Sequence, residues 1–314
     1  MTQDAGVVAP FETPLRRQTW RGRLSGALRP WRKQPLGIMG GVIIALLLFL
    51  AFFAPLVAPN DPREFVGRRL ESPSSQFLLG TNNLGQDVFS RTLYGAQIAV
   101  AVGVVSTVLG VGLGAVLGII TGYVGGWLDM LTQRALELLA SFPGLFLALL
   151  VITVLGRPGE TGASLWGIAW ELRWLEVAIG IIFVFGQTRI IRSATMTERN
   201  MTYVMAAHSI GVGPFRILYR HILPNVMPYI IVSFTTIIGI IILLEAAISF
   251  LGYGAPSGVP SWGTDLSARN REFFVQAPWL IAGPGVALSL TILGFNFFGD
   301  ALRDILDPRL RGSR

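Results

Sequence analysis

The sequence predicts an all-α polytopic membrane protein with six transmembrane helices. Hydrophobic residues make up 52% of its 314 residues and charged residues only 14%, whereas a soluble domain has about 25% charged residues. The mean hydropathy is +0.59. The apolar residues also gather in six stretches, each about as long as a bilayer-spanning helix must be.

Stretches without Asp, Glu, Lys or Arg locate these spans, because a membrane helix needs about 20 apolar residues. The fourth stretch is shorter, and we include it because Glu176, Arg189 and Arg192 can extend to the two membrane interfaces. The predicted spans are 38–57, 98–122, 134–156, 175–191, 228–251 and 279–298.

The distribution of basic residues predicts the orientation. If the N-terminus is inside, 17 of the 25 Lys and Arg residues lie in cytoplasmic segments or at the inner ends of the third and fourth spans, which favours both termini in the cytoplasm. The first apolar run is too long, and starts too far along the chain, for a cleavable signal. The cytoplasmic segments are then 1–36, 192–227 and 300–314, and the outer loops are 58–97, 157–174 and 252–278.

The composition excludes several kinds of chemistry. With no cysteine and two histidines, we expect neither a thiolate nor a multi-histidine metal site. A P-loop needs Lys followed by Ser or Thr, but the only lysine, Lys33, is followed by Gln34. We therefore expect no ATPase site, catalytic residue, metal or cofactor in this chain. The basic excess is attributed to cytoplasmic loops and not to nucleic-acid binding.

Four glycines form a ridge on the second span. Gly110, Gly114, Gly118 and Gly122 repeat every fourth residue, so on a helix they share one face and allow close approach of another helix. Packing within the chain is favoured over a subunit interface.

A tryptophan-rich segment lies in the outer loop 157–174. Trp166, Trp170 and Trp174 share one face if the segment is helical. This spacing predicts a short amphipathic helix at the membrane interface. A substrate-contacting aromatic platform is the alternative.

The cytoplasmic loop 192–227 is predicted to contain a helix–turn–helix. A helix is expected from Thr202 to about Ile210, with Gly211 as its C-terminal stop. Pro214 can open the next helix. Small residues at the exposed end allow such a hairpin to enter a groove on another protein, although a connector that packs under its own bundle is the alternative.

This loop resembles the coupling motif of ABC-transporter permeases, which reads Glu-Ala-Ala, three residues, Gly, nine residues, then a hydrophobic-x-Leu-Pro ending. Met205 stands where the motif has glutamate. The ending His-Ile-Leu-Pro-Asn at 221–225 is similar to the oligopeptide/dipeptide (nickel) subfamily. The residues assigned to the motif and its ATPase contact are Tyr203, Met205, Ala206, Ala207, Gly211, Leu223 and Pro224.

Four further blocks resemble that subfamily, and the last indicates the C-type of its two paired permeases. Together the match covers about residues 37–311. The blocks are 79–91, 122–129, 245–252 with 260–263, and 298–308.

The resemblance implies a type I ABC importer permease in the bacterial plasma (inner) membrane. Such a chain pairs with a second permease subunit as a heterodimer, binds two ATPase subunits that hold ATP and Mg²⁺, and receives substrate from an extracytoplasmic binding protein. Closure of the ATPases moves the coupling helix and switches access, a rigid-body transition. The substrate is left open among dipeptides, oligopeptides, nickel complexes, glutathione and other small solutes.

Glu245 is an acidic residue within the fifth span, and both a structural and a pathway role are considered for it, the structural one being favoured. It also bears on the alternative functions. An ion-coupled secondary transporter needs ionisable groups near the midplane, and this chain offers only Glu245. A non-transporting membrane scaffold would leave the motif-bearing loop unexplained.

Overall fold

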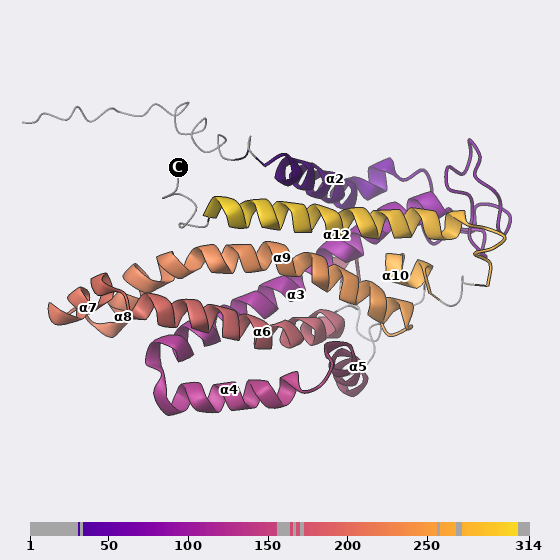
Figure 1. Ribbon diagram of the computed structural model, residues 1–314. Coiled ribbons are helices and arrows are strands. Elements are labelled where there is room, and N and C mark those ends of the chain that lie inside the picture. The colour runs from indigo at the N-terminus through magenta and orange to yellow at the C-terminus, as the bar shows by residue number, and fades with distance from the viewer. Residues whose placement is uncertain are drawn as a thin grey trace, which may run out of the picture.

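The fold is a bundle of long helices (Figure 1). The computed structural model describes residue 31 and residues 34–155, 164–165, 168–169, 173–255, 258–267 and 272–306. The helices are α2 (Pro35–Val57), α3 (Val88–Val124), α4 (Gly126–Ala140), α5 (Gly144–Leu155), α6 (Arg173–Arg199), α7 (Thr202–Ser209), α8 (Pro214–Ile217), α9 (Leu223–Phe250), α10 (Trp262–Asp265) and α12 (Trp279–Leu306). A π-helical turn, η3 (Leu218–Ile222), joins α8 to α9.

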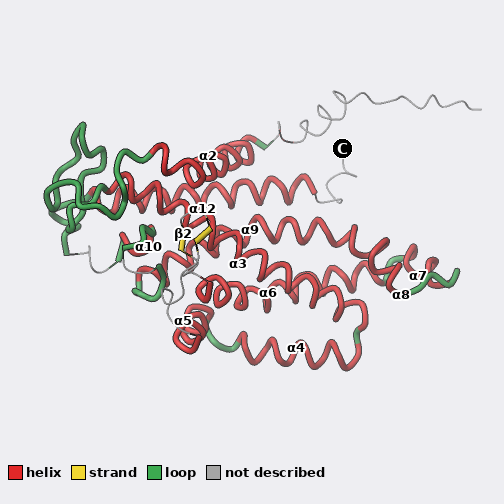
Figure 2. Tube along the Cα trace, turned by 180° about the vertical axis from the view of Figure 1, so that it is seen from behind, coloured by secondary structure: helices red, strands yellow, loops and turns green. Residues whose placement is uncertain are grey.

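Among the described residues, five helices are long and apolar enough to cross a membrane, and a sixth span results if the bent pair α4 and α5 is counted as one. The prediction of an all-α, multi-span membrane protein is therefore confirmed. Loops and short elements gather at the end of the bundle opposite α7 and α8 (Figure 2).

The second span begins ten residues before the predicted start at residue 98. The side chain of Asp87 caps α3 by accepting hydrogen bonds from the backbone N–H groups of Phe89 and Ser90. Arg91 interrupts the apolar run, but its guanidinium is buried and paired with Asp265, with 2.6 Å between nitrogen and oxygen. A search for uncharged stretches excludes any turn that contains a charged residue. It therefore cannot detect a helical turn in which that residue is paired with an opposite charge far away in the sequence.

The third span is not the single helix predicted over 134–156. Instead α4 and α5 meet at a 90° bend. Pro143 follows directly after Phe142, and a residue before proline is disfavoured in the helical conformation. Arg134 and Glu137, three residues apart on α4, form an exposed ion pair at 3.0 Å.

The tryptophan-rich segment also differs from its prediction. Strands β1 (Ser164–Leu165) and β2 (Ile168–Ala169) pair as an antiparallel hairpin, so no continuous interfacial helix runs through it. Trp174 belongs to the first turn of α6. Trp166 and Trp170 lie outside the described residues.

The glycine ridge packs within the chain, against α6. A Cβ atom added at Gly114 would lie 2.6 Å from the Cβ of Gln187, and one at Gly118 would lie 2.7 Å from the carbonyl oxygen of Thr188. These approaches are shorter than side-chain contacts permit, so the glycines set the distance between the two helices. The preferred interpretation of the ridge is thereby confirmed.

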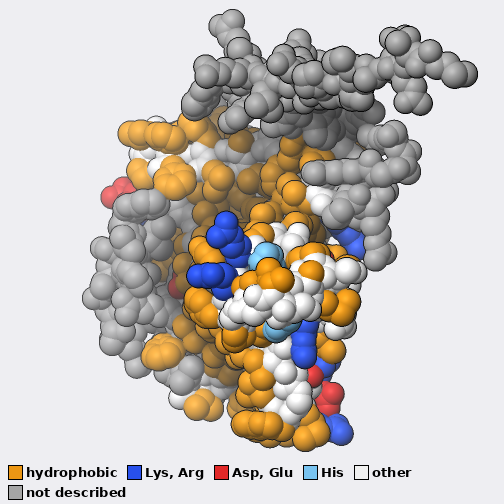
Figure 3. Space-filling view, turned by 90° about the vertical axis from the view of Figure 1, so that its left-hand side faces the viewer, with side chains coloured by type: hydrophobic (Ala, Val, Ile, Leu, Met, Phe, Trp, Pro, Cys, Tyr) orange, Lys and Arg blue, Asp and Glu red, His pale blue; other side chains and the backbone are white. Residues whose placement is uncertain are grey.

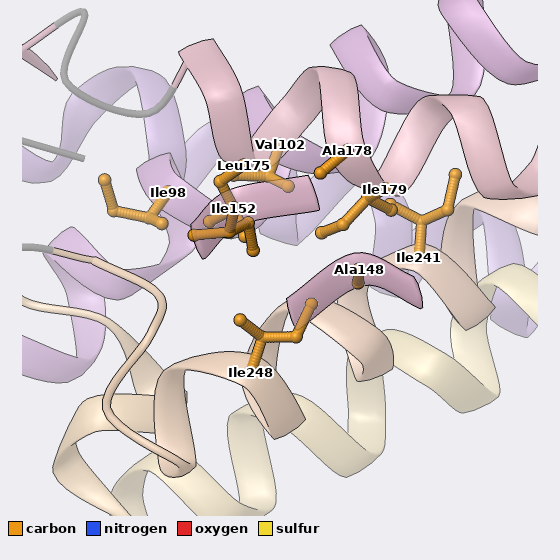
Figure 4. Close-up of a cluster of buried hydrophobic side chains, with 9 residues drawn as sticks. All are labelled: Ile98, Val102, Ala148, Ile152, Leu175, Ala178, Ile179, Ile241 and Ile248. Carbon is orange, nitrogen blue, oxygen red and sulfur yellow. The ribbon is translucent and has the colours of Figure 1, made fainter. Parts of the chain in front are cut away.

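Buried aliphatic side chains hold α5 against the rest of the bundle. Ala148 and Ile152 of α5 meet side chains from α3, α6 and α9 (Figure 4). The short second half of the broken span is therefore part of the core, whereas α4 exposes much of its surface. The cluster consists of Ile98, Val102, Ala148, Ile152, Leu175, Ala178, Ile179, Ile241 and Ile248.

Candidate functional site

Helices α7 and α8 form a hairpin at one end of the bundle (Figure 1). The N–H of Val212 donates to the carbonyl of Ala207 at 3.1 Å, and the N–H of Gly211 donates to that of His208 at 3.0 Å. This is a Schellman motif, in which the last helical carbonyls are satisfied and the following residue takes a positive φ. Gly211 has a φ of +74°, and Pro214 opens α8.

Two side chains of α7 anchor this hairpin to the bundle. Val204 and Ala207 are buried. They pack in one cluster with Ile191 of α6, Ile217 of α8 and Ile222 of η3. Burial of these apolar groups stabilises the hairpin as a rigid extension of α6 and α9. Ala207, assigned to the ATPase contact on sequence grounds, therefore faces the chain's own core.

Met205 and Ala206 lie on the opposite, exposed side of α7. Ile210 and Phe215, on either side of the turn, are each 80% exposed, and sequence reasoning did not select them. The available signal was two large apolar residues next to a Gly and Pro turn. Two such side chains in water at one tip indicate a contact with another protein or a membrane.

The hydroxyl of Tyr203 links α7 to α6 and α9 through hydrogen bonds. It donates to the carboxylate of Glu198 at 2.5 Å and accepts from Nδ2 of Asn225 at 3.0 Å. Desolvation by burial, and then the neighbouring Glu198, raise the pKa of Tyr203 to about 12. The phenol thus stays neutral and links the ends of α6, α7 and α9.

Leu223 and Pro224 are separate from the exposed face of α7 and belong to a groove along α8, η3 and the start of α9. Its volume is about 820 Å³. The remaining lining residues are Phe215, Arg216, Tyr219, Arg220 and Met227. Figure 3 looks onto this end, where basic side chains border exposed hydrophobic ones.

Glu245 lies near the other end of α9, about 30 Å from the hairpin by the rise of a helix. Its side chain is 1% exposed. The hydroxyls of Ser249 and Ser261 donate to one carboxylate oxygen at 2.6 and 3.0 Å. The carboxylate therefore connects α9 to the segment that leads into α10.

A second polar cluster at that end was not predicted as a functional feature. Besides pairing with Asp265, Arg91 donates to the carbonyl of Pro62 and to Oε1 of Gln86, both at 3.0 Å. The indole of Trp262 donates to the carbonyl of Thr92 at 2.9 Å. These contacts join the loop before α3 to α10, two segments whose proximity the sequence does not reveal.

Known proteins resemble this chain over most of its length. Residues 114–312 match the family described as binding-protein-dependent transport system inner membrane component, and residues 22–78 match the N-terminal TM domain of oligopeptide transport permease C. The chain is 37% identical over 293 residues to the dipeptide transport system permease protein DppC of Alkalihalophilus pseudofirmus, covering 91% of this chain and 92% of that protein. It is 40% identical over 286 residues to the glutathione transport system permease protein GsiD of Shigella flexneri, and 38% to that of Escherichia coli, covering 90% of each chain.

Proposed function

The chain belongs to the binding-protein-dependent inner-membrane transport components, and we propose that it forms half of the translocation path of an ATP-driven importer of small peptides. It is a multi-pass inner-membrane permease subunit of the peptide type of ABC transporter. Relatives named for dipeptide and for glutathione transport support a short peptide as the substrate. A second permease, two ATPases holding ATP and Mg²⁺, and an external binding protein would complete the transporter.

One observation carries the coupling role of α7, namely that the helix is exposed on one side and firmly attached on the other. Met205 and Ala206 are free to contact an ATPase, whereas Val204 and Ala207 are buried in the bundle. Tyr203 adds hydrogen bonds to Glu198 at 2.5 Å and Asn225 at 3.0 Å. A displacement of α7 by a closing ATPase dimer would therefore move α6 and α9 with it.

A cysteine cross-linking scan of residues 203–211 against the ATPase, in the assembled transporter, tests this role. The chain has no cysteine of its own, so each probe is unique. We expect cross-links from Met205, Ala206 and Ile210, and none from Val204 or Ala207, which serve as buried controls on the same helix. Cross-links only from 123–133 would contradict the assignment.

The cytoplasmic location of α7 also needs a direct test. A cysteine at Ser193, which is exposed on α6, should be shielded from an impermeant thiol reagent added outside intact cells. A cysteine at Ser164 should react. The reverse pattern would place α7 on the outer side and exclude an ATPase contact.

A further inference from the structure

The groove along α8, η3 and α9 carries a feature that the coupling role does not require. Arg216 and Arg220 are one helical turn apart and both line it, together with the aromatic side chains of Phe215 and Tyr219. No acidic residue lines the groove. Within the described part of the chain, the ion pairs involve neither guanidinium.

The position of the groove along the membrane normal follows from the charge-free run that begins just after it. Residues 222–244 contain no charged residue or histidine, and at helical rise these 23 residues span about 34 Å. The hydrocarbon core of a bilayer is about 30 Å thick, and a headgroup layer of about 5–7 Å lies on each side. This run places the inner end of the fifth span near Leu223, where α9 begins, and not at residue 228 as predicted from the sequence. Arg220 then lies at the edge of the hydrocarbon, and Arg216, about 6 Å further along, lies in the headgroup layer.

The groove thus has a cationic half at headgroup depth and an apolar half, formed by Leu223, Pro224 and Met227, at acyl-chain depth. Arginine binds phosphate oxygens through two parallel hydrogen bonds. We propose that this groove binds an anionic phospholipid, with Arg216 and Arg220 on the headgroup phosphate and the acyl chains along Pro224 and Met227.

Charge complementarity favours this occupant over the chain's own N-terminal tail. Residues 1–33 contain seven Lys and Arg residues but only two acidic ones, so the tail would be repelled by the two guanidiniums. An anionic lipid satisfies both halves of the groove at once. Each Arg near an anionic membrane surface contributes about fivefold in affinity.

The probe for the test is a fluorophore on a single cysteine introduced in place of Tyr219, in the full-length chain reconstituted into phosphatidylcholine vesicles. The vesicles contain either brominated phosphatidylglycerol or the same fraction of brominated phosphatidylcholine, and bromine quenches the fluorophore on contact. We expect stronger quenching by brominated phosphatidylglycerol. In the R216Q/R220Q background this preference should fall by about 25-fold, about fivefold for each arginine removed.

Arg303→Gln is the matched control, because Arg303 is exposed in the last turn of α12 and does not line the groove. It should keep the preference, which separates groove binding from the general attraction of a basic protein for anionic lipid. Equal quenching by the two lipids, or a preference unchanged in R216Q/R220Q, would overturn the proposal. So would cross-linking of the introduced cysteine to the ATPase, with loss of its lipid contact, in the assembled transporter. The coupling role of α7 is measured separately and can stand if the lipid site fails.

Discussion

The guanidinium of Arg192, on α6, forms a two-point ion pair with the carboxylate of Asp129, near the start of α4. Both side chains are largely buried. Parallel hydrogen bonds of this kind are the strongest that an arginine forms. The pair fixes the position of α4 beside α6, next to a backbone in which Gly125 and Gly126 both have positive φ values.

Asp129→Asn should therefore destabilise the chain by about 1–3 kcal/mol, because Arg192 would remain largely buried without its counter-charge. The measurement is thermal unfolding of the purified chain in detergent. Glu137→Gln is the control, since it breaks an exposed ion pair with Arg134 that contributes only about 0.5 kcal/mol or less. Equal effects of the two substitutions would show that the Asp129 pair does not hold α4 in place.

Gly114→Ala should lower the stability of the chain, whereas Gly112→Ala should not. A Cβ at Gly114 would lie 2.6 Å from the Cβ of Gln187 and force α3 from α6, whereas one at Gly112 meets nothing within 4 Å. We expect a cost of about 1–3 kcal/mol from overpacking at Gly114. At Gly112 the higher helix propensity of alanine should leave stability unchanged or slightly raised. The same thermal assay decides, and a harmless Gly114→Ala would contradict close packing at the ridge.

Gly211→Val should impair coupling through backbone strain. Gly211 has a φ of +74°, which a β-branched residue adopts only at a cost of about 1–3 kcal/mol. Nothing lies within 4 Å of a Cβ there, so any overpacking would come from a docked ATPase. Gly213→Val is the matched control, because Gly213 has a φ of −63° and equally open space.

The measurement for this pair is the ratio of substrate transport to ATP hydrolysis in the assembled transporter, with membrane insertion checked in parallel. We expect the ratio to fall for Gly211→Val and not for Gly213→Val. Loss of coupling in both variants would indicate that the loop tolerates no side chain at all, for reasons other than φ.

Tyr203 should ionise later than a free tyrosine. Its folded-state pKa is about 12, whereas the ordinary value is 10.0. Below pH 10 both folded and unfolded chains keep the phenolic proton, so the contribution of Tyr203 to stability is constant. As pH rises from about 10 to about 12 the unfolded chain loses its proton first, so the folded state loses stability over that interval.

The check is the phenolate absorbance of the folded wild-type chain minus that of Tyr203→Phe. The difference should rise with a midpoint near pH 12, and a midpoint near pH 10 would contradict the hydrogen bonding of this phenol to Glu198. Tyr219→Phe removes an exposed phenol and controls for the loss of one tyrosine.

Glu245→Ala should destabilise the end of α9 next to α10 by about 1–3 kcal/mol, because it leaves the hydroxyls of Ser249 and Ser261 without their acceptor. Glu245→Gln keeps an acceptor oxygen and should retain both stability and transport. Transport abolished by Glu245→Gln at unchanged melting temperature would instead favour a proton-carrying role, and with it an ion-coupled mechanism.

Hydropathy could locate the helices but not their breaks. Pro143 coincides with the bend between α4 and α5, yet α2, α9 and α12 run continuously through Pro55, Pro228 and Pro284. Proline within an apolar run therefore does not predict whether neighbouring helices will satisfy the freed backbone groups. The early start of α3 depends on Arg91 meeting Asp265, which lies 174 residues further along the chain.

In the candidate site, too, some features follow from the local sequence and others only from tertiary packing. Gly211 and Pro214 were sufficient to predict the turn after α7, because their backbone preferences are local. Ala206 and Ala207 are chemically identical neighbours, and only packing against Ile217 and Ile222 decides that Ala207 is the buried one. The side of a short helix that faces a partner is thus a property of the tertiary structure.

The bend between α4 and α5 lies at bilayer depth, since a Cβ at Gly144 would be 3.2 Å from Ile182, in the middle of the apolar part of α6. Phe142, within the bend, is 57% exposed on this chain. Acyl chains cannot hydrogen-bond the peptide groups that an interrupted helix releases, so irregular backbone at this depth must be covered by protein or water. The N–H groups of Ser141 and Phe142 donate within the chain, but any peptide group that the bend leaves without a helical partner would meet acyl chains in an unassembled copy. Binding of a partner subunit that covers the bend would therefore add to the stability of the folded chain. We expect membrane proteases to degrade copies without a partner faster than assembled ones.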